Sequence, residues 1–349
     1  MASGVRRVLP DQRIHVQPLA DGGEGTVDAL LAGVGGRRAQ VAVTGPIGAP
    51  VDAGYGELDD GSIVIEVASA TGLARLPPGE YAPLTAGSRG VGELVATAIE
   101  DHPRPQILVG IGGTASTDGG TGAATAIGYR FLDPRGRELA PGGGALRQLA
   151  RIDPDGATPP PGVIGLRDVA NPLLGARGCA RVYGPQKGAS PDQVAMLEEA
   201  MAILAERVRI DLGLDVAELP GAGAGGGLGA GLVAFMGAEL RPGPDVITDI
   251  VGLAARADGA DLVITGEGSL DHQSLEGKVP AGVAAIAAQA GAACLAVAGR
   301  IELSDAEMRA AGFAAWASAE DVAGAERALA DPAGAVEEAT VAALTSFRR

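Results

Sequence analysis

The chain has 349 residues, of which 46% are hydrophobic, so two domains with sizeable cores are the natural expectation. Its 56 glycines and 23 prolines follow no fixed period and lie between apolar runs, which excludes a collagen-like or a disordered chain. The formal net charge of −16 argues against a nucleic-acid partner and an anionic membrane surface, so local features must hold any anionic ligand.

Cysteine use and the uncharged windows favour a cytoplasmic protein. Cys179 and Cys294 are too few for a disulfide framework and suit a reducing compartment. The N-terminal residues lack the apolar run of a signal peptide. The uncharged windows 219–238 and 279–299 are broken by glycine or proline, so we expect no membrane-spanning helix.

The N-terminal region predicts the end of a helix at residues 5–9, a strand at Arg13–Leu19 and then a glycine turn. In that turn Asp21 and Glu24 lie three residues apart, and Thr26 is a candidate cap of the following helix. The two carboxylates suit a polar substrate or a metal-bound water. A capped strand-to-helix turn explains the same residues and is the favoured interpretation.

Residues 40–67 contain short alternating strands separated by Gly-Pro and Asp-Gly turns, a pattern typical of hairpins. Thr85–Gly92 then opens a helix that continues to Glu100. Ser88 and Arg89 at the start of this helix suit an anion, although a helix cap beside a solvated arginine is the safer interpretation.

The most informative stretch is Gly110–Gly122, GIGGTASTDGGTG. It follows the apolar run Gln106–Val109, so we expect a buried strand that runs into a glycine turn and then a helix. Glycines let backbone N–H groups approach a ligand, and a helix N-terminus adds about half a positive charge. The turn also carries hydroxyl and carboxylate groups, on Thr114, Ser116, Thr117 and Asp118. This pattern predicts an anion site, although a plain glycine turn explains the stretch equally well in isolation.

Downstream, Gly162–Val169 predicts a strand with Asp168 at its end, and Pro191–Arg207 predicts a periodic amphipathic helix. The core residues expected in this helix are Met196, Leu197 and Leu204.

From Asp258 onward, strands alternate with helices. Strands are predicted at 261–265, 293–298 and 313–318, and helices from Pro280 and over 306–311. This alternation favours right-handed βαβ units and a parallel sheet. Ligands of such sheets lie beyond the carboxyl ends of the strands, where Thr265–Lys278 and Gly299–Arg300 are expected.

Lys187 and Lys278 are the only lysines of the chain, and each adjoins a glycine at a junction that leads into a helix. A compact ammonium group on a flexible stem is a good partner for a phosphate. We therefore expect both lysines to contact a ligand, against the alternative that two surface lysines stand there by chance.

Common signatures do not fit the chain. A Walker A loop fails at Lys278, because His272 stands where its first glycine is required. Gly221–Gly226 matches G-x-G-x-x-G, but no strand leads into it. The three histidines and two cysteines are scattered, so only carboxylates remain for a hard ion such as Mg²⁺.

Six segments spread along the chain form an ordered set. They are Pro18–Thr26 (PLADGGEGT), Gly110–Gly120 (GIGGTASTDGG), Asp168–Leu173 (DVANPL), Tyr183–Ala189 (YGPQKGA), Pro220–Gly227 (PGAGAGGG) and Thr265–Leu270 (TGEGSL) with Glu276–Lys278 (EGK). Together they resemble the bacterial type II glycerate kinase family, in the order of that family and across nearly the whole chain. Each segment is weak alone, but the set is specific.

The resemblance implies an ATP-dependent kinase that phosphorylates D-glycerate with Mg²⁺, usually to 2-phosphoglycerate and otherwise to 3-phosphoglycerate. It also implies two α/β domains. One is a flavodoxin-like parallel-sheet domain made from both chain ends, placed at residues 1–41 and 244–349. The other is an inserted α/β domain resembling restriction endonucleases, placed at residues 42–243.

Phosphoryl transfer mainly requires positioning and charge neutralisation, which suggests roles for residues of these segments. Asp168 is the first choice for the catalytic base, because it ends a strand beside a proline-containing turn. Lys187 or Lys278 would balance developing charge. Asp118 is the third predicted catalytic residue, and Asp118 and Glu267 are the candidate magnesium ligands.

The remaining predicted positions would bind nucleotide or substrate. Backbone N–H groups of two glycine turns would hold phosphates, and Ser116 or Arg300 would bind the substrate carboxylate. The predicted binding residues are Asp21, Glu24, Thr26, Gly112, Gly113, Thr114, Ser116, Asn171, Gln186, Gly225, Gly226, Glu267, Lys278 and Arg300.

The chain departs from the family pattern at its start and at Ala170. Family members begin with a strand and an Asp-Ser-Phe-Lys-Gly type turn, whereas Met1–Leu9 resembles only the end of the helix that follows. The first strand of a flavodoxin-like sheet is central, so its loss would leave a gap with unpaired backbone groups. We therefore expect an upstream start codon or an impaired protein. Ala170 replaces a residue that is often polar and affects one contact.

Two alternatives stay open. One is a kinase for a related small hydroxy acid, and the other is a truncated relative that binds ligand without turnover. In either case the expected partner is a small molecule rather than nucleic acid or a membrane, and the oligomeric state is not predicted.

Overall fold

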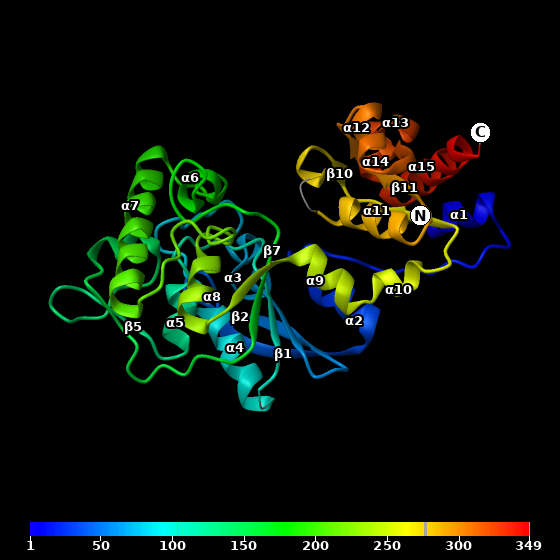
Figure 1. Ribbon diagram of the computed structural model, residues 1–349. Helices are drawn as coiled ribbons and strands as arrows, with labels where there is room; N and C mark the ends of the chain where they lie inside the picture. The colour runs from blue at the N-terminus through cyan, green and yellow to red at the C-terminus, as the bar shows by residue number, and fades with distance from the viewer. Residues whose placement is uncertain (103, 276–277, 349) are drawn as a thin grey trace. The chain divides into compact units, whose positions relative to one another are not determined.

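The computed structural model describes residues 1–102, 104–275 and 278–348 and has a mixed α/β fold with a parallel-sheet region (Figure 1). The chain divides into two compact units. Unit 1 comprises Met1–Leu19 and Ile247–Arg349, and unit 2 comprises Ala20–Val246.

Unit 2 is built on a six-stranded sheet with the order β1-β2-β3-β4-β7-β8. Its strands are β1 (Gly36–Thr44), β2 (Pro50–Leu58), β3 (Ile63–Glu66), β4 (Ile107–Gly110), β7 (Val163–Arg167) and β8 (Glu239–Pro242). The first three strands pair antiparallel, whereas β3, β4, β7 and β8 run parallel. Ile63–Ile65 and Ile107–Val109 are fully buried. Both faces of these central strands are covered, so their sequences are continuously apolar rather than alternating.

Helices and short turns surround this sheet. They are α2 (Thr26–Val34), α3 (Val67–Thr71), α4 (Arg89–Asp101), α5 (Thr121–Ala126), α6 (Cys179–Tyr183), α7 (Pro191–Arg207) and α8 (Leu228–Met236), with 3-10 turns at Leu73–Arg75, Gly143–Gln148 and Pro185–Lys187 and a π-helical turn at Val208–Leu212. Helix α9 (Gly243–Ile250) contains the division between the two units, at residues 246 and 247. A separate ribbon pairs β5 (Arg130–Leu132) antiparallel with β6 (Arg151–Asp153).

Helix α7 has the span predicted from its periodicity. It begins with a capping box, in which the Ser190 hydroxyl accepts a hydrogen bond from the Gln193 backbone N–H and the Gln193 side chain accepts one from Ser190. Leu197 and Leu204 are buried as expected, but Met196 is 38% exposed. Successive helical residues are about 100° apart around the axis, so Met196 points away from the buried stripe.

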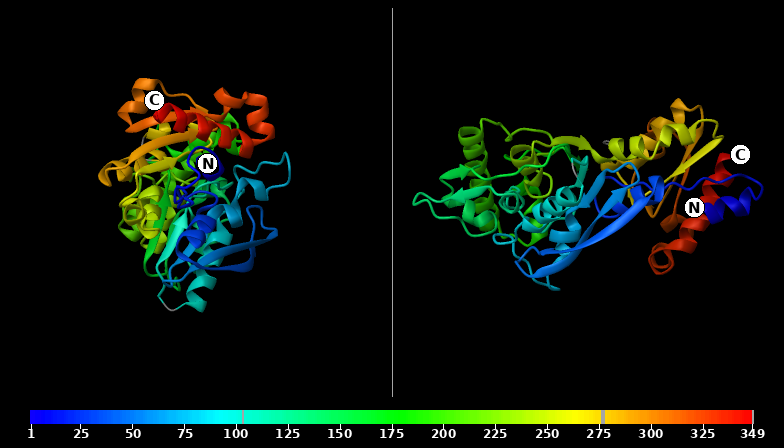
Figure 2. Two further views of the ribbon diagram at one scale, coloured as in Figure 1. Left: turned by 90° about the vertical axis from the view of Figure 1, so that its right-hand side faces the viewer. Right: turned by 90° about the horizontal axis from the view of Figure 1, so that it is seen from below.

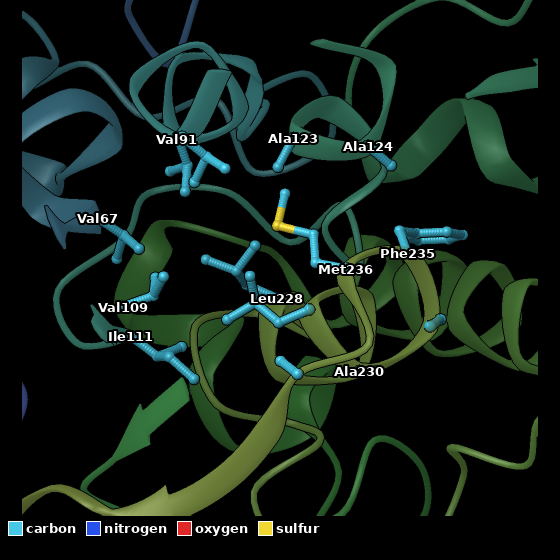
Figure 3. Packing of buried hydrophobic residues seen from close by; sticks show 14 of the residues in the cluster. Val67, Val91, Val109, Ile111, Ala123, Ala124, Leu228, Ala230, Phe235 and Met236 are labelled. Carbon is cyan, nitrogen blue, oxygen red and sulfur yellow. The ribbon is translucent and has the colours of Figure 1, made fainter. Parts of the chain in front are cut away.

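Small residues bring the helices of unit 2 close together. A Cβ atom at Gly92 of α4 would lie 2.1 Å from the Ala123 carbonyl oxygen of α5. Figure 3 shows the resulting cluster, in which Val91, Ala123 and Leu228 lie among larger side chains such as Phe235. Close backbone approach therefore fills a core that has few aromatic residues.

The division of the chain differs from the expected one at its first boundary. Helix α2 and strand β1 belong to unit 2, which begins at residue 20 rather than 42. They do so because β1 pairs with β2 along its whole length, from Gly36 opposite Leu58 to Thr44 opposite Pro50. The second division, at residues 246 and 247, lies close to the boundary expected at residue 244.

Unit 1 contains a three-stranded parallel sheet in the order β13-β11-β9. Its strands are β9 (Leu262–Thr265), β11 (Ala293–Ala298) and β13 (Phe313–Ser318), and β10 (Ser269–Leu270) pairs separately with β12 (Arg300–Ile301). The helices are α1 (Ala2–Val8), α10 (Leu253–Ala257), α11 (Val279–Gln289), α12 (Asp305–Ala310), α13 (Ala319–Ala323), α14 (Ala325–Ala330) and α15 (Pro332–Phe347), with a 3-10 turn at Gln273–Leu275. The predicted parallel sheet is confirmed.

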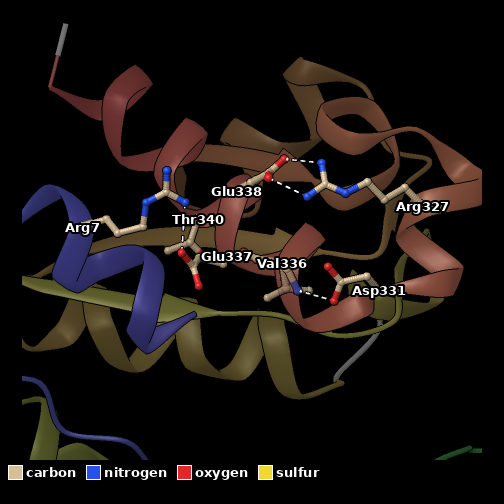
Figure 4. A network of polar contacts seen from close by, with 8 residues as sticks. Arg7, Arg327, Asp331, Val336, Glu337, Glu338 and Thr340 are labelled. Atoms are coloured by element: carbon tan, nitrogen blue, oxygen red, sulfur yellow. Dashed lines mark hydrogen bonds and ion pairs between the residues drawn. The ribbon is translucent and has the colours of Figure 1, made fainter.

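The two ends of the chain meet within unit 1, as the blue and red helices of Figure 2 show. A Cβ atom at Gly4 would lie 2.6 Å from the Glu337 carbonyl oxygen, so glycine lets α1 pack directly on α15. Figure 4 shows the Arg7–Glu337 ion pair across this contact, at 3.0 Å, and the Arg327–Glu338 pair that joins α14 to α15.

One predicted element is wrong. Arg13–Leu19 is not a strand but an irregular segment, and Val16 is 70% exposed. A strand needs a paired neighbour to satisfy its backbone groups, and no neighbouring strand pairs with these residues. The alternation of apolar and polar residues in Arg13–Leu19 is therefore not sufficient to form a strand.

Candidate active site

Glycine turns and polar side chains meet near the carboxyl ends of β4 and β7. They line a crevice of about 110 Å³, which we call the glycine crevice. Its lining residues are Leu73, Gly112, Gly113, Thr114, Asp168, Val169, Tyr183, Gln186, Lys187, Gly225 and Gly226. Most of them were predicted site residues, although their segments are far apart in the sequence. They meet where ligands of parallel sheets are normally bound.

Glycine is required at Gly226 because two chain segments approach it closely. Its φ angle is +68°, which disfavours other residues. A Cβ atom there would lie 2.1 Å from the Ser116 carbonyl oxygen and 2.7 Å from the Lys187 Nζ atom. The glycine turn therefore packs directly against the Ser116 backbone and the lysine ammonium group.

Lys187 is a buried cation. The residue is 3% exposed, and its ammonium group donates a hydrogen bond to the Ser116 carbonyl oxygen. Burial lowers the pKa of Lys187 to about 8, and the neighbouring Cys179 and Asp118 act in the opposite direction. The ammonium group is thus mainly protonated at neutral pH and loses its proton in a mildly basic solution.

Asp168 follows β7 directly, and its side chain is exposed at the crevice wall. Burial, together with the negative charge of Asp168, raises the pKa of the neighbouring Tyr183 to about 12. The Tyr183 hydroxyl donates to Asn171 Oδ1 at 2.8 Å, and Asn171 Nδ2 donates to the Arg177 carbonyl oxygen at 2.8 Å. Asn171 therefore orients the tyrosine at the crevice wall and does not itself line the crevice.

Asp118 was expected to act as a catalytic residue and magnesium ligand, but its side chain lies inside the protein and not at the crevice wall. It is fully buried, and its Oδ2 atom accepts hydrogen bonds from the Ser88 backbone N–H and hydroxyl at 2.8 Å and from the Gly122 N–H at 3.1 Å. Its Oδ1 atom accepts one from the Gly120 N–H. A carboxylate with this many donors joins the starts of α4 and α5 and has little capacity left for a metal ion. Ser88 is accordingly a structural residue at the start of α4, which agrees with the safer of its two sequence-based interpretations.

Ser116 is also buried rather than exposed to a substrate. Its hydroxyl lies 3.0 Å from the Thr114 hydroxyl, within the turn that follows β4. Its carbonyl oxygen accepts the Lys187 hydrogen bond. The residue thus supports the crevice wall through its backbone.

The turn at residues 20–26 packs against the ends of β4 and β7. A Cβ atom at Gly110 would lie 2.4 Å from the Gly22 carbonyl oxygen. Asp21 Oδ1 accepts the Gly23 N–H at 3.0 Å, which favours the structural interpretation of this carboxylate. Thr26 is not the cap residue, because Gly25 is the N-cap of α2 and Thr26 is the first residue of the helix. The Thr26 hydroxyl donates to the Gly23 carbonyl oxygen.

Glu24 is the residue of this turn that reaches toward the crevice. A Cβ atom at Gly113 would lie 3.3 Å from Glu24 Oε1. Glu24 is exposed, so its carboxylate remains accessible beside a glycine that lines the crevice.

The remaining predicted site residues belong to unit 1. Glu267 follows β9, and its carbonyl oxygen accepts the Gly299 N–H at 3.1 Å. Arg300 begins β12 and forms an ion pair with Glu302. Lys278 is the N-cap residue of α11. Glu276 and Gly277, which complete the last predicted segment, lie outside the described residues.

Three residues that line the crevice, Leu73, Val169 and Tyr183, were not predicted as site residues. Tyr183 and Lys187 belong to the same predicted segment, Tyr183–Ala189, and this shared segment is the sequence signal that could have identified Tyr183 as a site residue. Leu73 follows α3, and no local sequence pattern marks it as a site residue. It reaches the crevice because its backbone N–H donates a hydrogen bond to the carbonyl oxygen of Gly113, which is distant in the sequence.

Among residues 1–102, 104–275 and 278–348, no group of three or more His, Cys, Asp or Glu side chains is arranged to hold a metal ion. Over the same ranges, no helix is both long and apolar enough to cross a membrane.

The fold and the crevice define an α/β protein with a polar, glycine-lined site at the carboxyl edge of parallel strands. The sequence profile of the glycerate kinase family matches residues 1–347. The chain belongs to the glycerate kinase family, and it is a kinase, a phosphotransferase with an alcohol group as acceptor.

Relatives of known sequence and structure support this assignment. The chain is 44% identical over 302 residues to a glycerate kinase of Halalkalibacterium halodurans, with 85% of this chain and 79% of that protein covered. It is 44% identical over 288 residues to a glycerate 2-kinase of Escherichia coli, with 81% and 75% covered. A crystal structure of a candidate glycerate kinase 2 from Salmonella typhimurium is 39% identical, with a TM-score of 0.81 and 99% and 91% covered.

Proposed function

We propose that the protein transfers the γ-phosphoryl group of ATP to a hydroxyl group of D-glycerate and forms 2-phosphoglycerate. The names of the relatives, glycerate kinase and glycerate 2-kinase, support the substrate and the position of transfer. The observation that carries the site assignment is the meeting of glycine turns, the Lys187 ammonium group and the Asp168 carboxylate in the glycine crevice.

In this proposal the crevice holds the transferred phosphoryl group. Backbone N–H groups of the turns at Gly112–Gly113 and Gly225–Gly226 hydrogen-bond to phosphate oxygens, which glycine permits by close approach. The Lys187 ammonium group offsets negative charge as the phosphoryl group is transferred. Positioning and charge neutralisation account for most of the catalysis of such reactions.

Asp168 accepts the proton of the glycerate hydroxyl in this proposal. Its carboxylate is exposed at the crevice wall, so it is accessible to a bound substrate, unlike the buried Asp118. Gln186 of the crevice wall offers an amide group to the hydroxyls of the substrate.

Mg²⁺ is the cation that we propose to accompany ATP. It usually binds one or two protein carboxylates together with phosphates and water, so it does not need a cluster of three protein ligands. The exposed Glu24 carboxylate beside Gly113 suits a metal-bound water, and Glu267 in unit 1 remains a candidate ligand. Asp118 is withdrawn as a ligand, because its oxygens accept the backbone hydrogen bonds described above. When bound, Mg²⁺ neutralises phosphate charge.

For unit 1 we propose a flavodoxin-like fold, and for unit 2 a fold resembling restriction endonucleases. Lys278 and Arg300 remain proposed ligand contacts. Arg300 is preferred to Ser116 for the glycerate carboxylate, because Ser116 is fully buried.

Replacement of Asp168 by Asn tests the catalytic base. We expect turnover to fall at least about 100-fold, with thermal unfolding unchanged because the side chain is exposed. Asp52→Asn, which changes an exposed aspartate on β2 outside the crevice, is the matched control. Unchanged turnover in Asp168→Asn would remove this residue from the role of base.

Product and substrate analysis tests the reaction itself. Phosphorus NMR of the product separates transfer to the 2-hydroxyl from transfer to the 3-hydroxyl. Faster turnover of another small hydroxy acid in a panel would assign a different substrate. Nucleotide binding without any phosphorylated product would identify a binding protein without kinase activity.

A further inference from the structure

Unit 2 contains a second cavity that the proposed reaction does not use. It has a volume of about 350 Å³ and shares no lining residue with the glycine crevice. It lies beside α5 and β5, whose places Figure 1 shows, and its wall includes Arg89, Thr125, Tyr129, Arg130 and Glu138. We call it the ribbon pocket. Its volume is within the range of pockets that bind small molecules.

Two guanidinium groups make the ribbon pocket suitable for an anion. Arg89 Nε donates to Glu93 at 2.9 Å, and Arg130 Nη2 is paired with Asp153. For the described residues these contacts leave other N–H groups of both side chains without a protein partner. In a chain of net charge −16, two arginines at one cavity are a local concentration of positive charge. Guanidinium groups match the planar geometry of carboxylate and phosphate oxygens.

Tyr129 adds a hydrogen-bond donor to the wall of the ribbon pocket. Its side chain lines the ribbon pocket, and the residue is only 8% exposed. Its ring packs against Phe235 with centroids 5.1 Å apart, and its hydroxyl oxygen is not one of the buried unpaired side-chain atoms of the described residues. Burial raises the pKa of Tyr129, so the hydroxyl remains a neutral donor. The hydroxyl is therefore available to donate a hydrogen bond to a ligand in the pocket.

The remaining polar groups narrow the class of ligand. Thr125 already donates its hydroxyl proton to the Thr121 carbonyl oxygen, so it offers only acceptor lone pairs to the pocket. Glu138 adds one carboxylate to the wall, which disfavours a highly charged polyanion. Acceptors beside cations suit a ligand that carries both an anionic group and hydroxyl groups.

The pocket wall is connected to the glycine crevice through Asp118. Ser88 and Gly122, next to or within the ribbon-pocket wall, both donate to Asp118 Oδ2. The following residue, Gly119, donates its N–H to the carbonyl oxygen of Gly226, which lines the crevice, at 3.2 Å. A ligand that fixes the wall at Arg89 and Gly122 therefore acts on a turn that also supports the crevice.

We propose that the ribbon pocket is an effector site for a small hydroxylated carboxylate or phosphate, separate from the site of phosphoryl transfer. The ligand's anionic group binds Arg89 and Arg130, and one of its oxygens accepts the Tyr129 hydroxyl. Occupancy changes turnover through the Asp118 turn.

Calorimetric titration of the full chain with three probes tests binding: inorganic phosphate, glycerate and 2-phosphoglycerate. Arg130→Gln has a matched control in Arg151→Gln, because both arginines pair with Asp153 but only Arg130 lines the pocket. For at least one probe we expect Arg130→Gln to weaken a saturable site at least about tenfold, and Arg151→Gln to change it less than about twofold. Tyr129→Phe, which keeps the ring, weakens the same site. Binding of inorganic phosphate but not glycerate would indicate a phosphate site, and binding of glycerate but not inorganic phosphate would indicate a carboxylate site.

Three results would overturn the proposal. The titrations are carried out on the Asp168→Asn protein. The first overturning result is that none of the three probes shows saturable binding that depends on Arg130. The second is equal weakening by Arg130→Gln and Arg151→Gln, which would indicate loss of the Asp153 pair alone. The third is an unchanged turnover rate of the parent enzyme when the site is saturated, which would remove the effector role. Thermal unfolding of each variant separates loss of binding from loss of fold.

Discussion

Replacement of Lys187 by Met tests the conclusion that a buried ammonium group adjoins the crevice. In the folded protein the pKa of Lys187 is lowered from 10.5 to about 8, mainly by burial. Between these values the unfolded chain holds the proton and the folded chain has lost it, so the free energy of unfolding rises with pH. The burial cost is therefore fully present below about pH 8 and disappears as pH approaches about 10.5.

From these values, the free energy of unfolding of the parent should rise by about 2 kcal/mol more than that of Lys187→Met between about pH 7.5 and pH 10. Near neutral pH the variant loses the Ser116 hydrogen bond, which costs about 1–3 kcal/mol, but it also loses the penalty of a buried charge. The two effects largely cancel, so Lys187→Met should fold with a stability close to that of the parent.

Urea unfolding at several pH values measures this difference. The tyrosines, Tyr55, Tyr81, Tyr129 and Tyr183, all lie in unit 2, whereas the one tryptophan, Trp316, lies in unit 1. Tyrosine absorbance and tryptophan fluorescence therefore report on the two units separately. Arg209→Met, which removes an exposed cation in unit 2, is the control and should leave the pH dependence unchanged.

Turnover provides the second measurement for Lys187. If its protonated form offsets phosphate charge, turnover of the parent falls as pH rises through about 8, and Lys187→Met is inactive at every pH. A stability difference between parent and variant that stays constant from pH 7.5 to pH 10 would refute the buried-cation reasoning. Full turnover in the variant would refute its catalytic role.

Two other substitutions test the supporting structure. Gly226→Ala places a Cβ atom 2.1 Å from the Ser116 carbonyl oxygen at a positive φ angle, so we expect a loss of about 2–4 kcal/mol in urea unfolding and lower turnover; parent-like stability would contradict this packing. Asp118→Asn turns one acceptor into a donor that faces other donors, so we expect a loss of about 2–4 kcal/mol without added Mg²⁺. A variant of full stability with weakened Mg²⁺ binding would restore Asp118 as a metal ligand.

The spans of several elements followed from local sequence. Helix α7 and strands β11 and β13 have the predicted bounds, because periodicity, a proline after the cap residue and glycine breaks are local signals. The glycine turn after β4 was predicted on the same grounds. Arg13–Leu19 shows the limit of such signals, since a strand depends on a neighbour that the local sequence does not contain.

For the site, the sequence determined which residue types were available, and the tertiary structure decided what each one does. The sequence marked Asp118 and Asp168 alike as carboxylates beside turns. Only long-range packing buried Asp118 under donors from Ser88 and Gly122 and left Asp168 exposed at the crevice wall. Burial and hydrogen bonding set the chemistry of a charged group, and both depend on residues far away in the chain. The same holds for Lys187, whose pKa is lowered by the segments that fold around it.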